Sequence, residues 1–159
     1  GAKAEPEIAQ VAADLHVPII LMHNRENMDY GVDFWTTAKV DLEKSIAIAR
    51  QAGVPDHHII LDPGIGFAKN TAQNIAMMQH LSDLVAMGYP VLLATSRKSM
   101  IGNVLNLPVE ERLEGTSATV VYGIEKGCHM IRVHDVKEMA RATYMTDVLV
   151  GKRLFKEEA

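Results

Sequence analysis

Residues 58 to 70 read HIILDPGIGFAKN, and this stretch decides the fold. Its first four residues form a short apolar run that is typical of a buried parallel strand. The run ends at Asp62, because Pro63 has no backbone N–H and Gly64 allows a tight turn. We therefore expect Asp62 at the carboxyl end of a buried strand, which is where α/β folds bind ligands. Its carboxylate could accept hydrogen bonds from a polar heterocycle, or it could cap the following turn.

The composition indicates one globular domain over residues 1–159. The chain is 48% hydrophobic and 23% charged, with a formal net charge of −4 and a pI near 6.0. The negative charge argues against a general nucleic-acid binder. No apolar run has the length of a membrane span, and no signal-peptide pattern opens the sequence. The single cysteine, Cys128, excludes an internal disulfide and favours a cytoplasmic location.

Apolar runs of strand length alternate with segments of helical periodicity along the chain. Strict alternation favours parallel strands joined by right-handed crossovers, so the predicted class is α/β with four parallel strands. Two architectures fit, an open doubly wound sheet and part of a (β/α)₈ barrel. We expect Thr71 to cap the third helix and Asp135 the last. The predicted helices span 5–15, 34–52, 71–87, 100–104, 109–126 and 136–150, and the predicted strands 18–22, 58–61, 90–94 and 129–134.

Polar residues follow all four predicted strands, and parallel strands bring their carboxyl ends to one rim. Arg132 and His134 are two apart in a strand, so their side chains share one face. A guanidinium beside an imidazole and next to a helix N-terminus suits an anion, and Lys98 adds a cation near Asp62. The set suits a substrate with a polar ring and a phosphate-like leaving group. The rim residues are His23, Asn24, Arg25, Asp62, Ser96, Arg97, Lys98, Ser99, Arg132, His134 and Asp135.

Each candidate also has a purely structural interpretation. His134 could be a hydrogen-bonded strand-end histidine, and Lys98 a solvated lysine at a helix start. His57 and His58 point opposite ways on a strand, so no metal ligand is predicted there or elsewhere in the chain. A dinucleotide fingerprint is excluded, because Lys69 stands where the third glycine of G-x-G-x-x-G would be.

Four motifs resemble the late motifs of the dihydropteroate synthase family, in that family's order and spacing. The opening segment, residues 1–6, resembles the segment after that enzyme's fourth strand. The resemblance covers essentially the whole chain but only the carboxyl-terminal half of the enzyme. It implies the (β/α)₈ TIM-barrel fold, of which this chain would be about the last half. The motifs are Leu61–Phe67, Ser96–Ser99 with Ile101–Gly102, Gly115–Thr116 and Arg132–Val136.

The resemblance implies a transferase of folate biosynthesis. The family condenses p-aminobenzoate with 6-hydroxymethyl-7,8-dihydropterin pyrophosphate, which gives dihydropteroate and pyrophosphate, and sulfonamides compete for the p-aminobenzoate site. It also implies Mg²⁺, whose ligand belongs to the amino-terminal part of the family, and a homodimer formed through late helices. Since that amino-terminal part also holds pterin and pyrophosphate ligands, we expect this chain to be inactive alone.

The resemblance further implies roles for individual residues. Asp62 would hydrogen-bond the pterin ring, and Lys98 would contact the pterin and the p-aminobenzoate region, with Ser99 near the latter. Arg132 would stack on the pterin and, with His134, meet the pyrophosphate. Lys98, Arg132 and His134 are thus the expected catalytic residues. The remaining expected pocket residues are Met22, Gly66 and Phe67.

Three alternatives remain open at this point. A pterin-dependent methyltransferase shares the barrel and the pterin site, although the motifs at 96–99 and 132–134 favour the synthase. A non-catalytic half-barrel could bind a pterin or only a partner protein. A flavodoxin-like nucleotide binder is less well supported, because no phosphate loop follows the first predicted strand.

Overall fold

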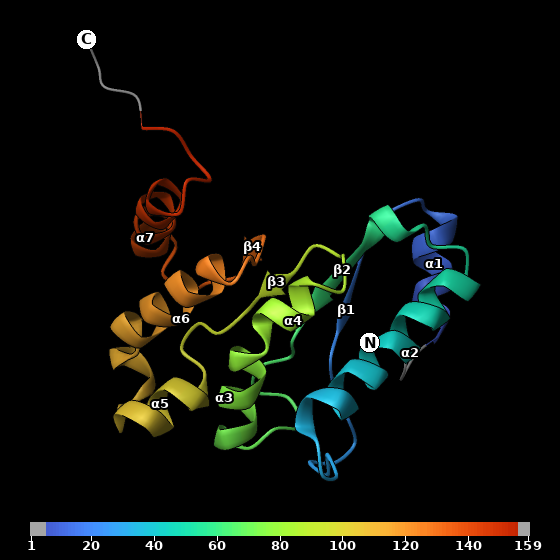
Figure 1. Cartoon of the computed structure of the whole chain (residues 1–159), viewed down its shortest axis with the longest axis horizontal. Helices are drawn as coiled ribbons and strands as arrows, with labels where there is room; N and C mark the ends of the chain where they lie inside the picture. The colour runs from blue at the N-terminus through green and yellow to red at the C-terminus, as the bar shows by residue number, and fades with distance from the viewer. Residues whose placement is uncertain (1–5, 156–159) are drawn as a thin grey trace.

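Helices and strands alternate along the chain as the sequence predicts. The computed structural model describes residues 6–155, so nearly all of the opening segment 1–6 lies outside the described residues. Two short 3₁₀ helices accompany the main elements, at Asp56–His58 and Val109–Glu111. The main elements (Figure 1) are α1 Pro6–Asp14, β1 Ile19–Met22, α2 Phe34–Gln51, β2 Ile59–Asp62, α3 Thr71–Gln79, α4 Leu81–Val85, β3 Leu92–Leu93, α5 Ser99–Leu105, α6 Leu113–Glu125, β4 Met130–Ile131 and α7 Val136–Leu149.

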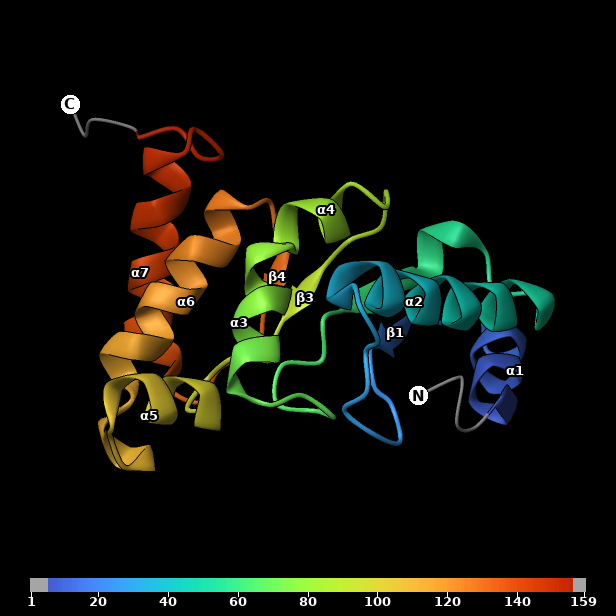
Figure 2. The ribbon, with the colours of Figure 1, turned by 60° about the horizontal axis from the view of Figure 1, so that its bottom comes forward.

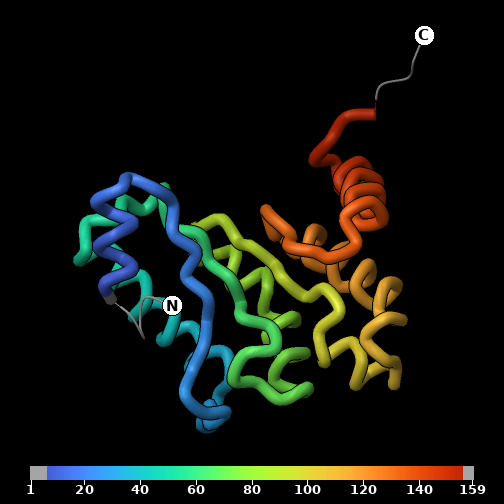
Figure 3. The backbone as a smooth tube through the Cα atoms, turned by 180° about the vertical axis from the view of Figure 1, so that it is seen from behind, coloured from blue at the N-terminus to red at the C-terminus, as the bar shows by residue number. Residues whose placement is uncertain are grey.

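The four strands are parallel and lie in chain order. β1 pairs with β2, which places Met22 opposite Asp62, and β3 pairs with β4. A single parallel bridge between Leu61 and Val91 joins the two pairs. Seen from behind in Figure 3, the strand segments run side by side in front of the helices. One face of the strands is therefore covered by helices, and the carboxyl ends of the strands meet at one rim.

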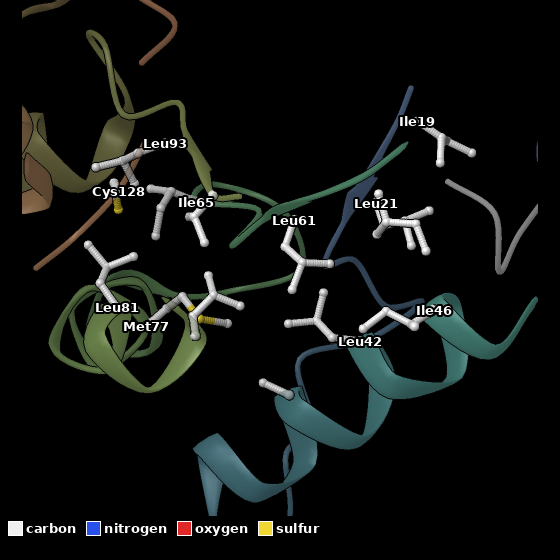
Figure 4. Close-up of a cluster of buried hydrophobic side chains, with 14 of the residues drawn as sticks. Ile19, Leu21, Leu42, Ile46, Leu61, Ile65, Met77, Leu81, Leu93 and Cys128 are labelled. Carbon is white, nitrogen blue, oxygen red and sulfur yellow. The ribbon is translucent and has the colours of Figure 1, made fainter. Parts of the chain in front are cut away.

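The core fills the space between the strands and the helices that cover them. Figure 2 shows α2, α3 and α6 in one layer across the strands. In the close-up of Figure 4, Leu42 of α2 points toward Leu21 and Leu61 of the strands, and Met77 of α3 lies near Ile65. All five side chains are at least 99% buried, and each contributes roughly 1.5–3 kcal/mol by burial. No helix within residues 6–155 is both long enough and apolar enough to span a membrane.

The predicted helix 71–87 is broken in the structure. α3 ends at Gln79 and α4 begins at Leu81. His80 stands between them, where its ring stacks on Trp35 and its Nδ1 lies 2.6 Å from Asp83 Oδ2. The backbone of His80 departs from helical geometry, with φ −92° and ψ 13°.

The predicted cap at Thr71 is wrong, whereas Asp135 is the N-cap residue of α7 as predicted but does not cap the helix with its side chain. Asn70 caps α3, because its side chain accepts from Gln73 N while the Gln73 side chain accepts from Asn70 N. Asp135 makes no side-chain capping bond to α7, because its carboxylate binds Arg97 instead.

Three further predicted elements are shorter than expected. The predicted helix 109–126 begins with a 3₁₀ turn, and α6 starts only at Leu113. β3 and β4 contain two residues each. The backbone pairing of β4 stops because His134 N donates to the side chain of Ser96 rather than to a strand carbonyl.

A buried polar cluster joins the end of β1 to α2. His23 is only 2% exposed, and its Nε2 lies 3.5 Å from Asp41 Oδ2. Arg25 Nε lies 3.3 Å from the same oxygen. Burial, with the nearby charge of Lys69, lowers the pKa of His23 to about 4 even though Asp41 raises it. The ring is therefore neutral in the folded chain at neutral pH.

The lowered pKa of His23 makes stability depend on pH. Between pH 6.5 and about 4 the unfolded chain binds a proton at this ring that the folded chain does not. The free energy of unfolding therefore falls as the pH drops through this window, by on the order of 3 kcal/mol. Urea denaturation at several pH values should show this fall in the wild type and a weaker one in His23→Gln. His57→Gln, at an exposed position, controls for the residue change, and equal pH curves for wild type and His23→Gln would contradict the assignment.

The turn after β2 leaves room only for glycine. Gly64 has a φ of +66°, and a Cβ there would lie 1.9 Å from the His23 carbonyl oxygen. Gly88 has a φ of +87° but nothing within 4 Å of a Cβ. We expect Gly88→Ala to cost roughly 1–2 kcal/mol of unfolding free energy through backbone strain alone, and Gly64→Ala at least about 2 kcal/mol more through overlap. Urea denaturation of both variants measures the difference, and equal losses would show that the turn can relax.

Candidate functional site

Asp62 ends β2 and begins the loop that leads to α3. Its side chain is buried, and its Oδ1 accepts a hydrogen bond of 2.7 Å from Gly64 N. The turn-capping interpretation is thus confirmed for this oxygen, and a carboxylate has further lone pairs for a ligand. Burial raises the pKa of Asp62, against the hydrogen bond from Gly64 and the charges of Lys98 and Lys69, which lower it.

Two lysines hold the carbonyl groups of this loop. Lys69 is only 8% exposed, and its Nζ donates to Gly64 O and to Phe67 O, each at 3.0 Å. Lys98 Nζ donates to Ile65 O. Burial lowers the pKa of Lys69 to about 8, although the charge of Asp62 raises it. The loop backbone is therefore fixed by cations that come from both of its sides.

Asn74 completes the support of the loop from α3. It is 2% exposed, its Oδ1 accepts Gly66 N at 2.7 Å, and its Nδ2 donates to Lys69 O at 3.2 Å. Gly66 has a φ of +84°, and a Cβ there would lie 3.3 Å from Lys98 Cδ. Glycine at this position lets the lysine stem lie close across the loop.

Lys98 lies at the centre of the predicted rim. It is the N-cap residue of α5, and its Nζ is 4.9 Å from the centroid of the Phe67 ring. Burial lowers the pKa of Lys98, the charge of Asp62 raises it, and that of Arg132 lowers it. Lys98 is therefore close to a carboxylate, an aromatic ring and a second cation, which β2, its loop and the end of β4 supply.

His134 is attached to the loop that follows β3. Its backbone N donates to Ser96 Oγ at 3.1 Å, and its Nδ1 lies 2.9 Å from the same oxygen. The neighbouring residues are also paired, because Arg97 Nε donates to Asp135 Oδ2 at 2.9 Å and Arg97 Nη2 donates to the other oxygen. The guanidinium holds the pKa of the Asp135 carboxyl below its usual range. Ser96 and Arg97, which follow β3, thus bind the two consecutive residues that follow β4.

The remaining predicted residues occupy the edges of this site. Met22 is partly buried and is paired in register with Asp62. Ser99 is exposed and begins α5, next to Lys98. The structure thus groups Asp62, Gly66, Phe67 and Arg132 around Lys98. His134 is held by the adjoining loop.

Sequence reasoning missed the residues that support the site. The sequence patterns assign no supporting role to Lys69 or to Asn74. An asparagine in the first turn of a helix is a known source of side-chain to backbone hydrogen bonds, which was the available signal for Asn74. For Lys69 the signal was its place directly after a glycine-rich turn, where backbone carbonyls need donors.

The sequence was compared with protein families and with curated proteins. The model of the family described as pterin binding enzyme matches residues 1–134. The dihydropteroate synthase of Bacillus subtilis is 55% identical over 152 residues, which cover 96% of this chain and 53% of that enzyme. The chain therefore spans about half the length of this relative.

Solved structures give the same relationship. The structure of dihydropteroate synthase from Clostridium difficile in the presence of pteroic acid superimposes with a TM-score of 0.87 at 43% identity, over 90% of this chain and 54% of that one. The Yersinia pestis enzyme in a sulfonamide drug complex gives a TM-score of 0.86 at 35% identity, over 92% and 56%. The strands and helices of this chain correspond to about half of the (β/α)₈ fold of these enzymes. Because the family model covers most of its length, the chain belongs to the pterin-binding enzymes.

Proposed function

We propose that this chain, over residues 1–159 as a single unit, supplies the carboxyl-terminal half of a dihydropteroate synthase active site. The observation that carries the proposal is the position of Lys98, which lies close to Asp62, Phe67 and Arg132 at one rim. A carboxylate and an aromatic ring suit a polar heterocycle, and the cations suit its phosphate-bearing arm. The relatives crystallised with pteroic acid and with a sulfonamide drug support a site of this kind.

The proposed reaction is a substitution at the methylene carbon of the dihydropterin. The C–O bond breaks and pyrophosphate leaves with the electron pair, after which the amine of p-aminobenzoate forms a C–N bond and loses a proton. Asp62 accepts hydrogen bonds from the pterin ring, and its negative charge favours the cationic ring that forms. Arg132 and His134 donate to the leaving pyrophosphate, and Lys98 contacts both substrates. These are electrostatic tasks that fixed groups perform without reorganisation.

The described residues do not by themselves fit the Mg²⁺ that the family resemblance implies. Residues 6–155 contain no group of three or more His, Cys, Asp or Glu side chains that could hold a metal ion. We propose that the Mg²⁺ ligand belongs to the part of the family barrel that has no counterpart in this chain.

Further features follow from the same proposal. The substrates are p-aminobenzoate and the dihydropterin pyrophosphate, sulfonamides are the inhibitors, and the complete enzyme is a cytoplasmic homodimer. The runner-up is a pterin-dependent methyltransferase, and the Ser96–Ser99 and Arg132–His134 motifs still favour the synthase. A non-catalytic pterin-binding half-barrel is the remaining alternative for this chain alone.

Titration with a pterin pyrophosphate analogue tests whether the chain binds a pterin. Asp62→Asn retains an oxygen for the bond from Gly64 but loses the charge, so we expect the calorimetric affinity to fall about ten- to a hundredfold. Asp56→Asn is the matched control, because Asp56 precedes the amino end of the same strand, where it pairs with Arg50. Unchanged affinity in Asp62→Asn would remove Asp62 from the proposed site.

A chimeric enzyme tests the complete function. We would replace the matching half of the Bacillus subtilis enzyme with this chain and measure dihydropteroate formation. We expect turnover in the chimera, and at least about a hundredfold loss of kcat in Lys98→Ala or Arg132→Ala, because each removes a charge that acts on the transition state. Lys39→Ala, on the outer side of α2, is the surface control. A folded chimera that binds both substrates without turnover would refute the synthase assignment.

A further inference from the structure

The hydroxyl of Ser96 occupies an unusual position between two groups of the same residue. Ser96 is 5% exposed, and its Oγ lies 3.1 Å from His134 N and 2.9 Å from His134 Nδ1. Its contacts are sufficient to decide which ring nitrogen of His134 carries the proton.

The donors and acceptors around Ser96 determine which nitrogen of the His134 ring is protonated. A backbone N–H can only donate, so the bond from His134 N occupies one lone pair of Ser96 Oγ. If Nδ1 were protonated, Oγ would accept twice, and its own hydrogen would need another acceptor. Within residues 6–155 the structure gives this hydroxyl no third partner. A buried hydroxyl without an acceptor is costly, whereas a hydroxyl that donates to Nδ1 satisfies all three groups.

We propose that Ser96 is a positioning residue that holds the neutral His134 ring with Nδ1 as acceptor and Nε2 as the N–H donor. The two nitrogens lie on opposite sides of the ring, so the donor faces away from Ser96. Its use as a donor to the leaving pyrophosphate rests on the function proposed above. A neutral histidine fixed in this way donates to an anion without first being protonated.

The surrounding loop makes this geometry rigid. Arg97, next to Ser96, has a φ of +57°, a left-handed conformation that needs support in a residue other than glycine. Thr116 Oγ1 accepts Arg97 N at 3.0 Å, and Arg112 Nη1 donates to Arg97 O at 2.9 Å. The Arg97 side chain binds both carboxylate oxygens of Asp135. Within residues 6–155 the structure shows a hydrogen bond between the His134 ring and Ser96 and none between the ring and this carboxylate.

Nuclear magnetic resonance of the 159-residue chain, labelled with ¹⁵N at histidine, tests the tautomer directly. The chain contains seven histidines, and the His134 signals are identified by their loss in His134→Gln. We would read the chemical shifts of the two ring nitrogens at alkaline pH. We expect one tautomer, with Nε2 protonated and Nδ1 not. A protonated Nδ1 in the wild-type chain would overturn the proposal without any variant.

Substitutions at Ser96 test whether this residue is the cause. Ser96→Ala should give a mixture of both His134 tautomers, and Ser96→Thr, which retains a hydroxyl, should restore one. Thr119→Val is the matched control, because it removes a partly buried hydroxyl that contacts Thr95, the residue before Ser96, without touching His134. The same unmixed tautomer in Ser96→Ala as in the wild type would overturn the positioning role.

Titration with inorganic pyrophosphate separates this proposal from the proposed function. At alkaline pH we expect Ser96→Ala to bind pyrophosphate about three- to tenfold more weakly than the wild type, which is the range expected for one lost orienting hydrogen bond. Thr119→Val should bind normally. A tautomer change in Ser96→Ala with no change in pyrophosphate affinity would support the positioning role and count against the proposed anion site.

Discussion

The contact between the turn after β2 and the end of β1 determines the geometry of the whole rim. The backbone at Gly64 passes so close to the His23 carbonyl that a methyl group does not fit between them. The close contact between Gly64 and His23 determines where β2 ends relative to β1. It therefore also determines the position of Asp62 opposite Met22. The loop from Gly64 to Lys69 starts from this point, so the positions of Gly66 and Phe67 depend on the same contact.

Cations add to apolar packing in holding the loop in place, because the Ile65 side chain is buried in the core while two lysines bind the loop backbone. Lys69 and Lys98 donate to its carbonyl groups, and Asn74 binds its remaining backbone groups. A buried lysine is unfavourable unless its donors are satisfied, and here burial lowers the pKa of both lysines. The loop therefore has its conformation before any ligand arrives, which reduces the ordering that ligand binding requires.

The sequence predicted most helices and strands and the residues that follow each strand. It did not predict which partners those residues contact. Short apolar runs bounded by glycine and proline located the strands, and the carboxyl-end rule led to Asp62, Lys98, Arg132 and His134. The break at His80 could not be predicted from hydrophobic periodicity, and the stacking partner of His80, Trp35, lies 45 residues earlier in the chain. The roles of Lys69, Asn74 and Ser96 depend on which carbonyl or ring nitrogen each side chain reaches. Hydrophobic periodicity carries no information about such partners.

The double contact between the loops after β3 and β4 has a consequence for how mutations combine. Ser96 binds His134, and the adjacent Arg97 binds the adjacent Asp135. Because the two contacts join the same two loops, we expect that breaking one weakens the other. Residues that share such a network have non-additive free energies. Substitutions at these four positions are thus expected to show epistasis, and a change tolerated in one genetic background can be harmful in another. The two loops would then diverge together over evolutionary time rather than one position at a time.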